Sequence, residues 1–183
     1  LGPWFIFVAA LFVMSLGIAL VTRGNLGTTP ISSLPLVSSY ASNLTFGETT
    51  FLINLLFVVA QWLLLRRSIN KVLLLAQIPI TFAFSYFIDT SMKFTEFLSS
   101  DVYWKCLAVS MLGNVVLGLG VALEVFSGAA ALPGEGLVLA VSTVLHKPFS
   151  SVKIANDVIL VLLVLLLSYC VFHGIRGLRE GTV

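Results

Sequence analysis

Charged residues are scarce in this chain of 183 amino acids. Only 10% of the residues are Asp, Glu, Lys or Arg, 58% are hydrophobic, and the mean hydropathy is +1.08. A soluble domain carries about 25% charged residues. Because the chain has too few polar side chains to cover a surface in water, we interpret it as an integral membrane protein with the lipid bilayer as its main partner. The net charge of +2 gives no reason to expect nucleic acid as a partner.

The sequence also lacks the motifs of several enzyme classes. It contains no HExxH, no cluster of Cys and His, no P-loop and no dinucleotide fingerprint. Serine and threonine are plentiful, but no His and Asp accompany them at a matching depth to activate a nucleophile. We therefore expect a protein that is not an enzyme, with no catalytic residues, no metal site and no cofactor.

Seven apolar stretches fill most of the chain. Five of them are about as long as the 20 residues that an α-helix needs to cross the hydrocarbon core: 4–22, 48–65, 72–88, 104–126 and 154–173. The other two, 30–43 and 129–145, are shorter and contain Pro30 and Pro133. The pattern predicts an all-α polytopic membrane protein in a single transmembrane domain. It has five full transmembrane helices and two short, proline-started helices that are re-entrant or half-length.

Part of the sequence of the first half recurs in the second half. When the sequence is shifted by 103 positions, nine residues of the first half align with identical residues of the second half. The first set is Leu16, Gly17, Ala19, Leu20, Pro30, Leu34, Leu36, Ser39 and Phe46, and the second set, in the same order, is Leu119, Gly120, Ala122, Leu123, Pro133, Leu137, Leu139, Ser142 and Phe149. Similarity at a fixed period indicates an internal repeat. We predict repeats at about 4–66 and 104–173, joined by a linking helix at 72–89.

The loop that carries Arg66, Arg67 and Lys71 is the clearest topology signal. An excess of basic residues in a short loop places that loop in the cytoplasm of a multi-pass inner-membrane protein. If both short segments are re-entrant, three crossings separate the repeats, which then have opposite orientations, as is common in secondary transporters. If both short segments cross, the chain has seven crossings and the repeats are parallel. Charge does not decide between these topologies, whereas the length of 30–43 favours re-entry.

Short motifs in both halves resemble the YczE/YyaS/YitT-like family of bacterial membrane proteins. They are Leu16–Leu20, Leu26-Gly27, Pro30 and Phe46-Gly47 in the first half, Gly118–Leu123, Pro133-Gly134-Glu135-Gly136 and Phe149-Ser150 in the second, and Phe87-Ile88-Asp89 between them. The resemblance implies a multi-pass inner-membrane protein and supplies no substrate. The chain departs from the family's pattern at Ser32, where an acid is often found, and at Ala129-Ala130, where Leu-Gly is expected.

Polar residues near the two breaks are the candidate functional residues, because polar groups are costly in lipid and usually face a cavity or another helix. Helix N-termini at the two prolines would also present unpaired N–H groups. We expect the solute-binding residues to be Asn25, Thr28, Thr29, Ser32, Ser33, Asn54, Glu135, Ser142, Asn156 and Asp157. The breaks themselves are assigned to Gly24, Gly27, Pro30, Gly128, Pro133, Gly134 and Gly136. Turn geometry and hydrogen bonds between helices are the alternative explanation for these residues.

Two functions fit these features. The first is a secondary transporter or exporter of a small solute, with Glu135 as the group that couples transport to an ion gradient. The second is a non-enzymatic accessory or substrate-binding subunit that docks on another membrane protein through the small residues Ala9, Ala10, Ser15, Gly17 and Ala19. A homodimer is a further arrangement to consider, although no heptad pattern or isolated GxxxG motif predicts one.

Overall fold

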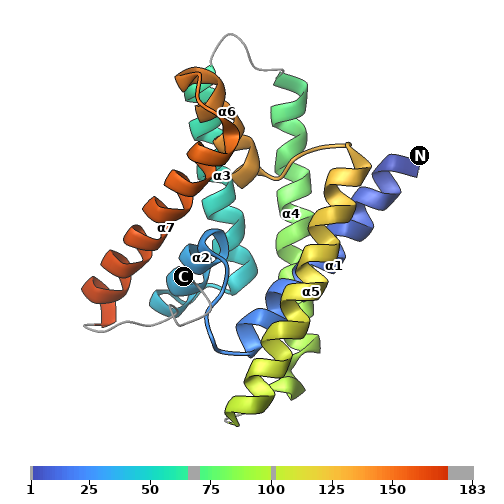
Figure 1. The fold of residues 1–183 in the computed structure, drawn as a ribbon, viewed down its shortest axis with the longest axis vertical. Coiled ribbons are helices and arrows are strands. Elements are labelled where there is room, and N and C mark those ends of the chain that lie inside the picture. Colours follow the sequence, from blue (N-terminus) through green and yellow to red (C-terminus); the bar gives the residue numbers. More distant parts are fainter. Residues whose placement is uncertain (1, 66–70, 100–101, 173–183) are drawn as a thin grey trace.

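The computed structural model describes residues 2–65, 71–99 and 102–172, and helices make up nearly all of this part (Figure 1). The elements are α1 (Gly2–Arg23), α2 (Pro30–Ala41), α3 (Phe46–Leu65), α4 (Lys71–Phe94), the short 3₁₀ helix η1 (Glu96–Leu98), α5 (Tyr103–Ser127), α6 (Pro133–Leu145) and α7 (Phe149–Phe172). The described residues contain no strand, which confirms the all-α class. Five of the helices, α1, α3, α4, α5 and α7, are long and apolar enough to cross a membrane.

Three helix boundaries differ from the prediction. The fourth helix continues to Phe94, and hydrogen bonds to other parts of the chain hold its last turns: the Asp89 carboxylate accepts from the Gly47 amide at 2.8 Å, and the hydroxyls of Ser91 and Ser15 share a hydrogen bond of 3.2 Å. The sixth begins only at Pro133, since the preceding residues form the break. The seventh begins at Phe149 because the carbonyl of Pro148 accepts the first bonds of the helix, from the amides of residues 151 and 152.

The outer surface of the molecule is apolar. Large hydrophobic side chains stand exposed along the outer faces of α5 and α7, among them Leu119, Phe126, Leu162 and Leu166. In water such a surface would be a liability, whereas in a bilayer it faces acyl chains. The structure is therefore that of a multi-pass membrane protein.

The helices pack in two groups that meet where α3 contacts α4. In the first group, α1 packs against α5 and α4. In the second, α3 packs against α6 and α2, and α7 packs against α2 and α6. Figure 1 shows the first group on the right and the second on the left. Each short helix thus lies against the long helix of the other half of the sequence, α2 on α7 and α6 on α3.

Neither short helix runs the length of the molecule. In Figure 1, α2 lies in the lower half and α6 in the upper half, while α1 and α5 run lengthwise in opposite directions. The chain leaves α5 at the upper end, and α7 starts again from that end. The loop assigned to the cytoplasm falls largely at 66–70, outside the described residues.

Several backbone features recur 103 positions apart. The helices α2 and α6 begin at the matching residues Pro30 and Pro133, and α3 and α7 begin at Phe46 and Phe149. The matching residues Asn25 and Gly128 both have a left-handed backbone conformation, with φ values of 53° and 57°, whereas Gly27, with a φ of 115°, has no such counterpart at Ala130. The two breaks therefore share some backbone features and differ in others.

Glycines let α1 and α5 approach closely. A Cβ atom placed on Gly17 would lie 2.6 Å from the backbone nitrogen of Leu117, and one on Gly113 would lie 2.6 Å from that of Val21. A Cβ on Gly120 would lie 2.5 Å from the Met14 side chain. Small residues at such contacts allow dispersion contacts to accumulate between helices in lipid. Gly118 belongs to the same helix but faces outward with nothing within 4 Å of an added Cβ.

Replacing Gly17 with alanine is expected to destabilise the protein by about 1–2 kcal/mol, because the new methyl group would collide with backbone atoms of α5. Gly118→Ala on α5 is the matched control and should leave stability unchanged or slightly raised. The measurement is the thermal unfolding midpoint of each purified variant in the same detergent. Equal midpoints for Gly17→Ala and the unmodified protein would contradict the tight α1–α5 contact.

Candidate functional site: a cavity between the two helix groups

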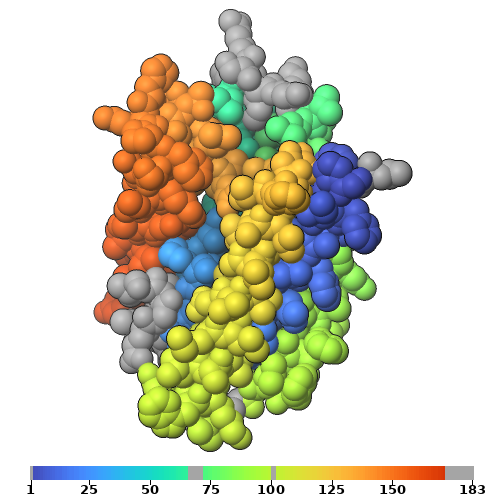
Figure 2. Space-filling view, turned by 45° about the vertical axis from the view of Figure 1, so that its right-hand side comes forward, coloured from blue at the N-terminus to red at the C-terminus, as the bar shows by residue number. Residues whose placement is uncertain are grey.

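A cavity of about 340 Å³ lies between the two helix groups. Residues of α1, α2, α3, α4, α5, α6 and α7 all line it, so it occupies the meeting point of the fold. Figure 2 shows the molecular surface hollowed between α5 and α7, with α2 visible at the floor of the hollow. The hollow opens on the side of the molecule, between two helices long enough to span the bilayer.

The starts of the two short helices meet at this cavity. Pro30 and Pro133 each occupy the first turn of their helix, where a missing N–H costs nothing. Ile31 of α2 lies directly against Gly134 of α6, where a Cβ atom would collide with it. Pro30, Ile31, Gly134 and Glu135 all border the cavity.

Side chains from α3, α4 and α5 hold the start of α6 in place. The Gln61 amide donates to the Pro133 carbonyl at 3.0 Å and exchanges hydrogen bonds with Gln77 at 3.2 and 3.3 Å. The Leu132 amide donates to the carboxylate of Glu124, which is 3% exposed, at 3.2 Å. These bonds use polar groups that would otherwise be unpaired in the interior, and they fix where Glu135 lies.

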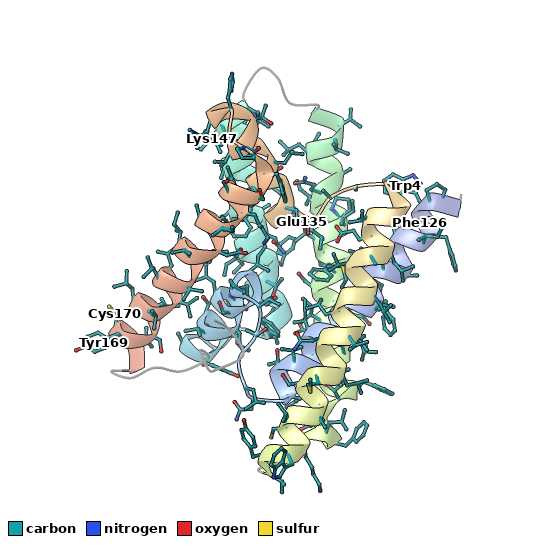
Figure 3. All side chains as sticks on the ribbon, in the orientation of Figure 1. Trp4, Phe126, Glu135, Lys147, Tyr169 and Cys170 are labelled. Atoms are coloured by element: carbon teal, nitrogen blue, oxygen red, sulfur yellow. The ribbon has the colours of Figure 1, made fainter. Side chains whose placement is uncertain are left out.

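The charged residues at the cavity come from α6 and α7. The Lys153 ammonium donates to the Asp157 carboxylate at 3.1 Å, one turn along α7. Glu135 borders the same cavity, and its carboxylate makes no hydrogen bond or ion pair with any other described residue. Figure 3 shows Glu135 in the middle of the molecule, far from Lys147 at its upper end.

The polar residues of the opposite wall come from α2 and α3. Thr29 and Ser32 border the cavity and share a hydrogen bond of 3.0 Å between their hydroxyls. Thr50 bonds to the Phe46 carbonyl of its own helix. Asn54 is 8% exposed, borders the cavity, and makes no side-chain hydrogen bond with another described residue. Its amide is therefore free to bind something that enters the cavity.

Of the ten predicted solute-binding residues, five border this cavity: Thr29, Ser32, Asn54, Glu135 and Asp157. Asn54 and Asp157 occupy matching positions in the two halves of the sequence. Among the residues assigned to the breaks, Pro30 and Gly134 also border it. Residues far apart in the sequence thus meet at one place.

The other five residues lie elsewhere. Asn25 is exposed in the loop after α1, Thr28 is buried, and the buried Ser33 donates to the Pro30 carbonyl at 2.6 Å. Ser142 is expected at the cavity because Ser39 matches it, but its hydroxyl donates to the Lys147 carbonyl at the end of α6. Asn156 faces a separate hollow between α6 and α7. These five residues therefore do not border the cavity that the other five line.

The glycines of the breaks have different local roles. Gly27 and Gly128 have positive φ values of 115° and 57°, which glycine adopts without strain. Gly24 packs on Cys106 and Ser110 of α5, and Gly136 packs on Gln61. Pro133 is buried and starts α6 without bordering the cavity.

The sequence interpretation missed Lys153 and Thr50 as cavity residues. It starts the last helix at 154, five residues too late, and so leaves Lys153 outside that helix. The signal for Lys153 is present, since a lysine four residues before an aspartate pairs with it on a helix face. Thr50 carries no signal of its own, because a threonine in an apolar helix usually bonds to its own backbone.

The described part of the chain contains no group of three or more His, Cys, Asp or Glu residues that could hold a metal ion. The cavity presents two carboxylates, one ammonium group, one amide and several hydroxyls. This set can bind a polar or charged group of a small molecule, but it lacks a nucleophile with a neighbouring base.

Residues 2–183 match a family of unknown function, DUF6198, and the chain belongs to that family. No curated protein and no solved structure matches the chain. These comparisons leave the resemblance to the YczE/YyaS/YitT-like proteins as a prediction.

Proposed function

We propose that this member of the DUF6198 family is a secondary transporter or exporter of a small solute across the bacterial inner membrane. The observation that carries the proposal is the cavity at which the starts of α2 and α6 meet. Secondary transporters commonly bind their solutes near the bilayer midplane, where short or broken helices begin. A cavity of about 340 Å³ falls in the range of small-molecule sites.

We propose further that α1–α3 and α5–α7 form an inverted repeat around this cavity. Three observations support it: α1 and α5 run in opposite directions, the helix starts recur at matching residues, and the short helices pack crosswise on α7 and α3. In this arrangement both short helices are re-entrant. Rocking of one half against the other would open the cavity to alternate sides of the membrane.

The upper end of the molecule in Figure 1 is the proposed cytoplasmic end. There α3 ends at Leu65 and α4 begins at Lys71. In the sequence, Arg66 and Arg67 directly follow α3. Lys147 also lies at the upper end (Figure 3). A basic excess in a short loop between two membrane-spanning helices favours the cytoplasmic side for that loop.

The alternative function as an accessory subunit loses its proposed docking face. Four of the five small residues assigned to that face, Ala10, Ser15, Gly17 and Ala19, are buried inside the molecule. Of the five, Ala9 is exposed. The four buried residues pack helices within the chain, and they offer no surface to another protein.

The test of transport does not require that the solute be identified first. Proteoliposomes are loaded with the small-molecule fraction of a bacterial cytosol, and the solutes released into the medium are followed by mass spectrometry. At least one solute is expected to leave faster than from liposomes without protein. If every detected solute is released at the same rate from loaded liposomes without protein, under both inward and outward ion gradients, the proposal is wrong.

A further inference from the structure

The charges at the cavity do not balance. Lys153 and Asp157 form an ion pair at 3.1 Å and neutralise each other. The Glu135 carboxylate has no such partner among the described residues, so the described charged residues of the lining sum to one negative charge. A carboxylate at the edge of an apolar cavity favours the arrival of a cation, because unpaired charge is costly away from water.

A second polar group reaches the cavity independently of Glu135. Asn54 lies on α3, is only 8% exposed, and has no hydrogen-bond partner for its side chain among the described residues. Buried polar side chains are normally hydrogen-bonded, so an unpaired amide facing a cavity indicates a missing ligand or water. Its carbonyl oxygen can accept a hydrogen bond from an ammonium group.

The remainder of the lining is mostly apolar. Side chains from α1, α2, α3, α4, α5 and the residue before α6 form the walls: Met14, Ile18, Ile31, Ile53, Phe84, Ile88, Leu117, Val121 and Leu132. A hydrated inorganic cation would gain nothing from such walls. An organic cation would place its apolar body against them while its charge meets Glu135.

An anion is the competing ligand, because two helices begin at the cavity and helix N-termini attract negative charge. At α6, two carboxylates of the protein already lie at the helix N-terminus. Glu135 lies in the first turn, and the carboxylate of Glu124 accepts the hydrogen bond of the Leu132 amide. An anion would therefore approach a carboxylate at α6. Only α2, which has no acid in its first turn, would favour it.

We propose that the cavity binds an organic cation, an ammonium group carried on a compact apolar body, with Glu135 as the counter-ion and Asn54 as a hydrogen-bond acceptor. This assignment rests on the proposed transport function for its biological meaning, but it concerns binding and can be tested without transport. The lateral opening between α5 and α7 is consistent with such a ligand, since amphipathic cations concentrate at the bilayer interface.

Equilibrium binding to the purified protein in detergent tests the assignment with three probes. Phenethylammonium has a ring and a positive charge, phenylacetate has the ring and a negative charge, and ethylammonium has the charge without the ring. Labelled phenethylammonium is expected to bind. Ethylammonium should compete at least tenfold more weakly, and phenylacetate should not compete.

Glu135→Gln should weaken phenethylammonium binding at least tenfold. Glu96→Gln, the same change at an exposed glutamate of η1, should have no effect. Lys153→Met provides a second variant in case Glu135→Gln does not fold. This substitution removes the ammonium group of Lys153 from the cavity lining, and we expect it to strengthen binding of the cation.

Three results would overturn the assignment: equal binding by the unmodified protein and a folded Glu135→Gln variant, competition by phenylacetate as strong as that of unlabelled phenethylammonium, or loss of cation binding in Lys153→Met. The experiments distinguish failure of the ligand assignment from failure of the proposed transport function. Solute release without binding of the cation would reject this ligand and keep the transport function. Cation binding without release of any solute would reject transport and keep the site.

Discussion

Replacing Val121 with tryptophan is expected to reduce solute release from proteoliposomes at least tenfold. Val121 lies on α5, is partly buried, and borders the cavity. An indole ring there would occupy space that the solute needs. Because the ring would enter an existing cavity, the folded protein should lose little stability, whereas the same ring in a filled core would cause strain.

Val115→Trp on the same helix is the matched control. Val115 is 61% exposed on the outer face of α5, so its substitution adds an aromatic ring to the lipid-facing surface and leaves the cavity unchanged. Release by this variant should equal that of the unmodified protein. If Val121→Trp releases solute at the normal rate while retaining a normal unfolding midpoint, the cavity is not the transport route.

Replacing Gln61 with leucine is expected to destabilise the protein by about 2–4 kcal/mol, because it removes three hydrogen bonds and leaves a buried amide unpaired. Gln61 and Gln77 are 3% and 5% exposed, so the amide that is left behind is largely shielded from bulk water. The substitution also removes the bond from α3 to Pro133. It should therefore loosen the start of α6 as well as lower the thermal unfolding midpoint.

The double variant Gln61→Leu/Gln77→Leu separates these effects. It removes both amides, so no unpaired side chain is left behind, and it should be more stable than Gln61→Leu alone. The free energies of unfolding of the unmodified protein, of Gln61→Leu, of Gln77→Leu and of the double variant form a cycle that gives the coupling energy. Additive losses would mean that the two amides do not interact.

The fold follows from the sequence because hydropathy and length dominate helix formation in a bilayer. The presence and order of the five long helices are predictable, since backbone groups in lipid must bond internally and long apolar stretches have no alternative to the helix. Errors arise at polar termini. The sequence around Thr90 looks like a loop, and the hydrogen bonds of Asp89 to the start of α3 and of Ser91 to α1, which hold the last turns of α4, cannot be read from it.

The candidate site is less predictable than the fold. The matching positions Asn54 and Asp157 both reach the cavity, so the repeat is informative there. At Ser142 the repeat gives a wrong prediction, because the Ser142 hydroxyl donates a hydrogen bond to the carbonyl of Lys147 just after α6. Pairwise contacts such as Lys153 with Asp157 depend on where a helix starts, and an error of five residues is enough to hide them.

The central claim is that α2 and α6 each enter and leave the membrane region from the same side, which makes the two halves inverted. Single cysteines at Glu96 and Lys147, in a protein without Cys106 and Cys170, test it by labelling with a membrane-impermeant maleimide in oriented vesicles. Both residues are exposed, next to the ends of long helices. An inverted repeat predicts that the two cysteines label from opposite sides of the membrane. Labelling of both from the same side would mean that α6 crosses the membrane, which would contradict the inverted repeat and the transport mechanism proposed from it.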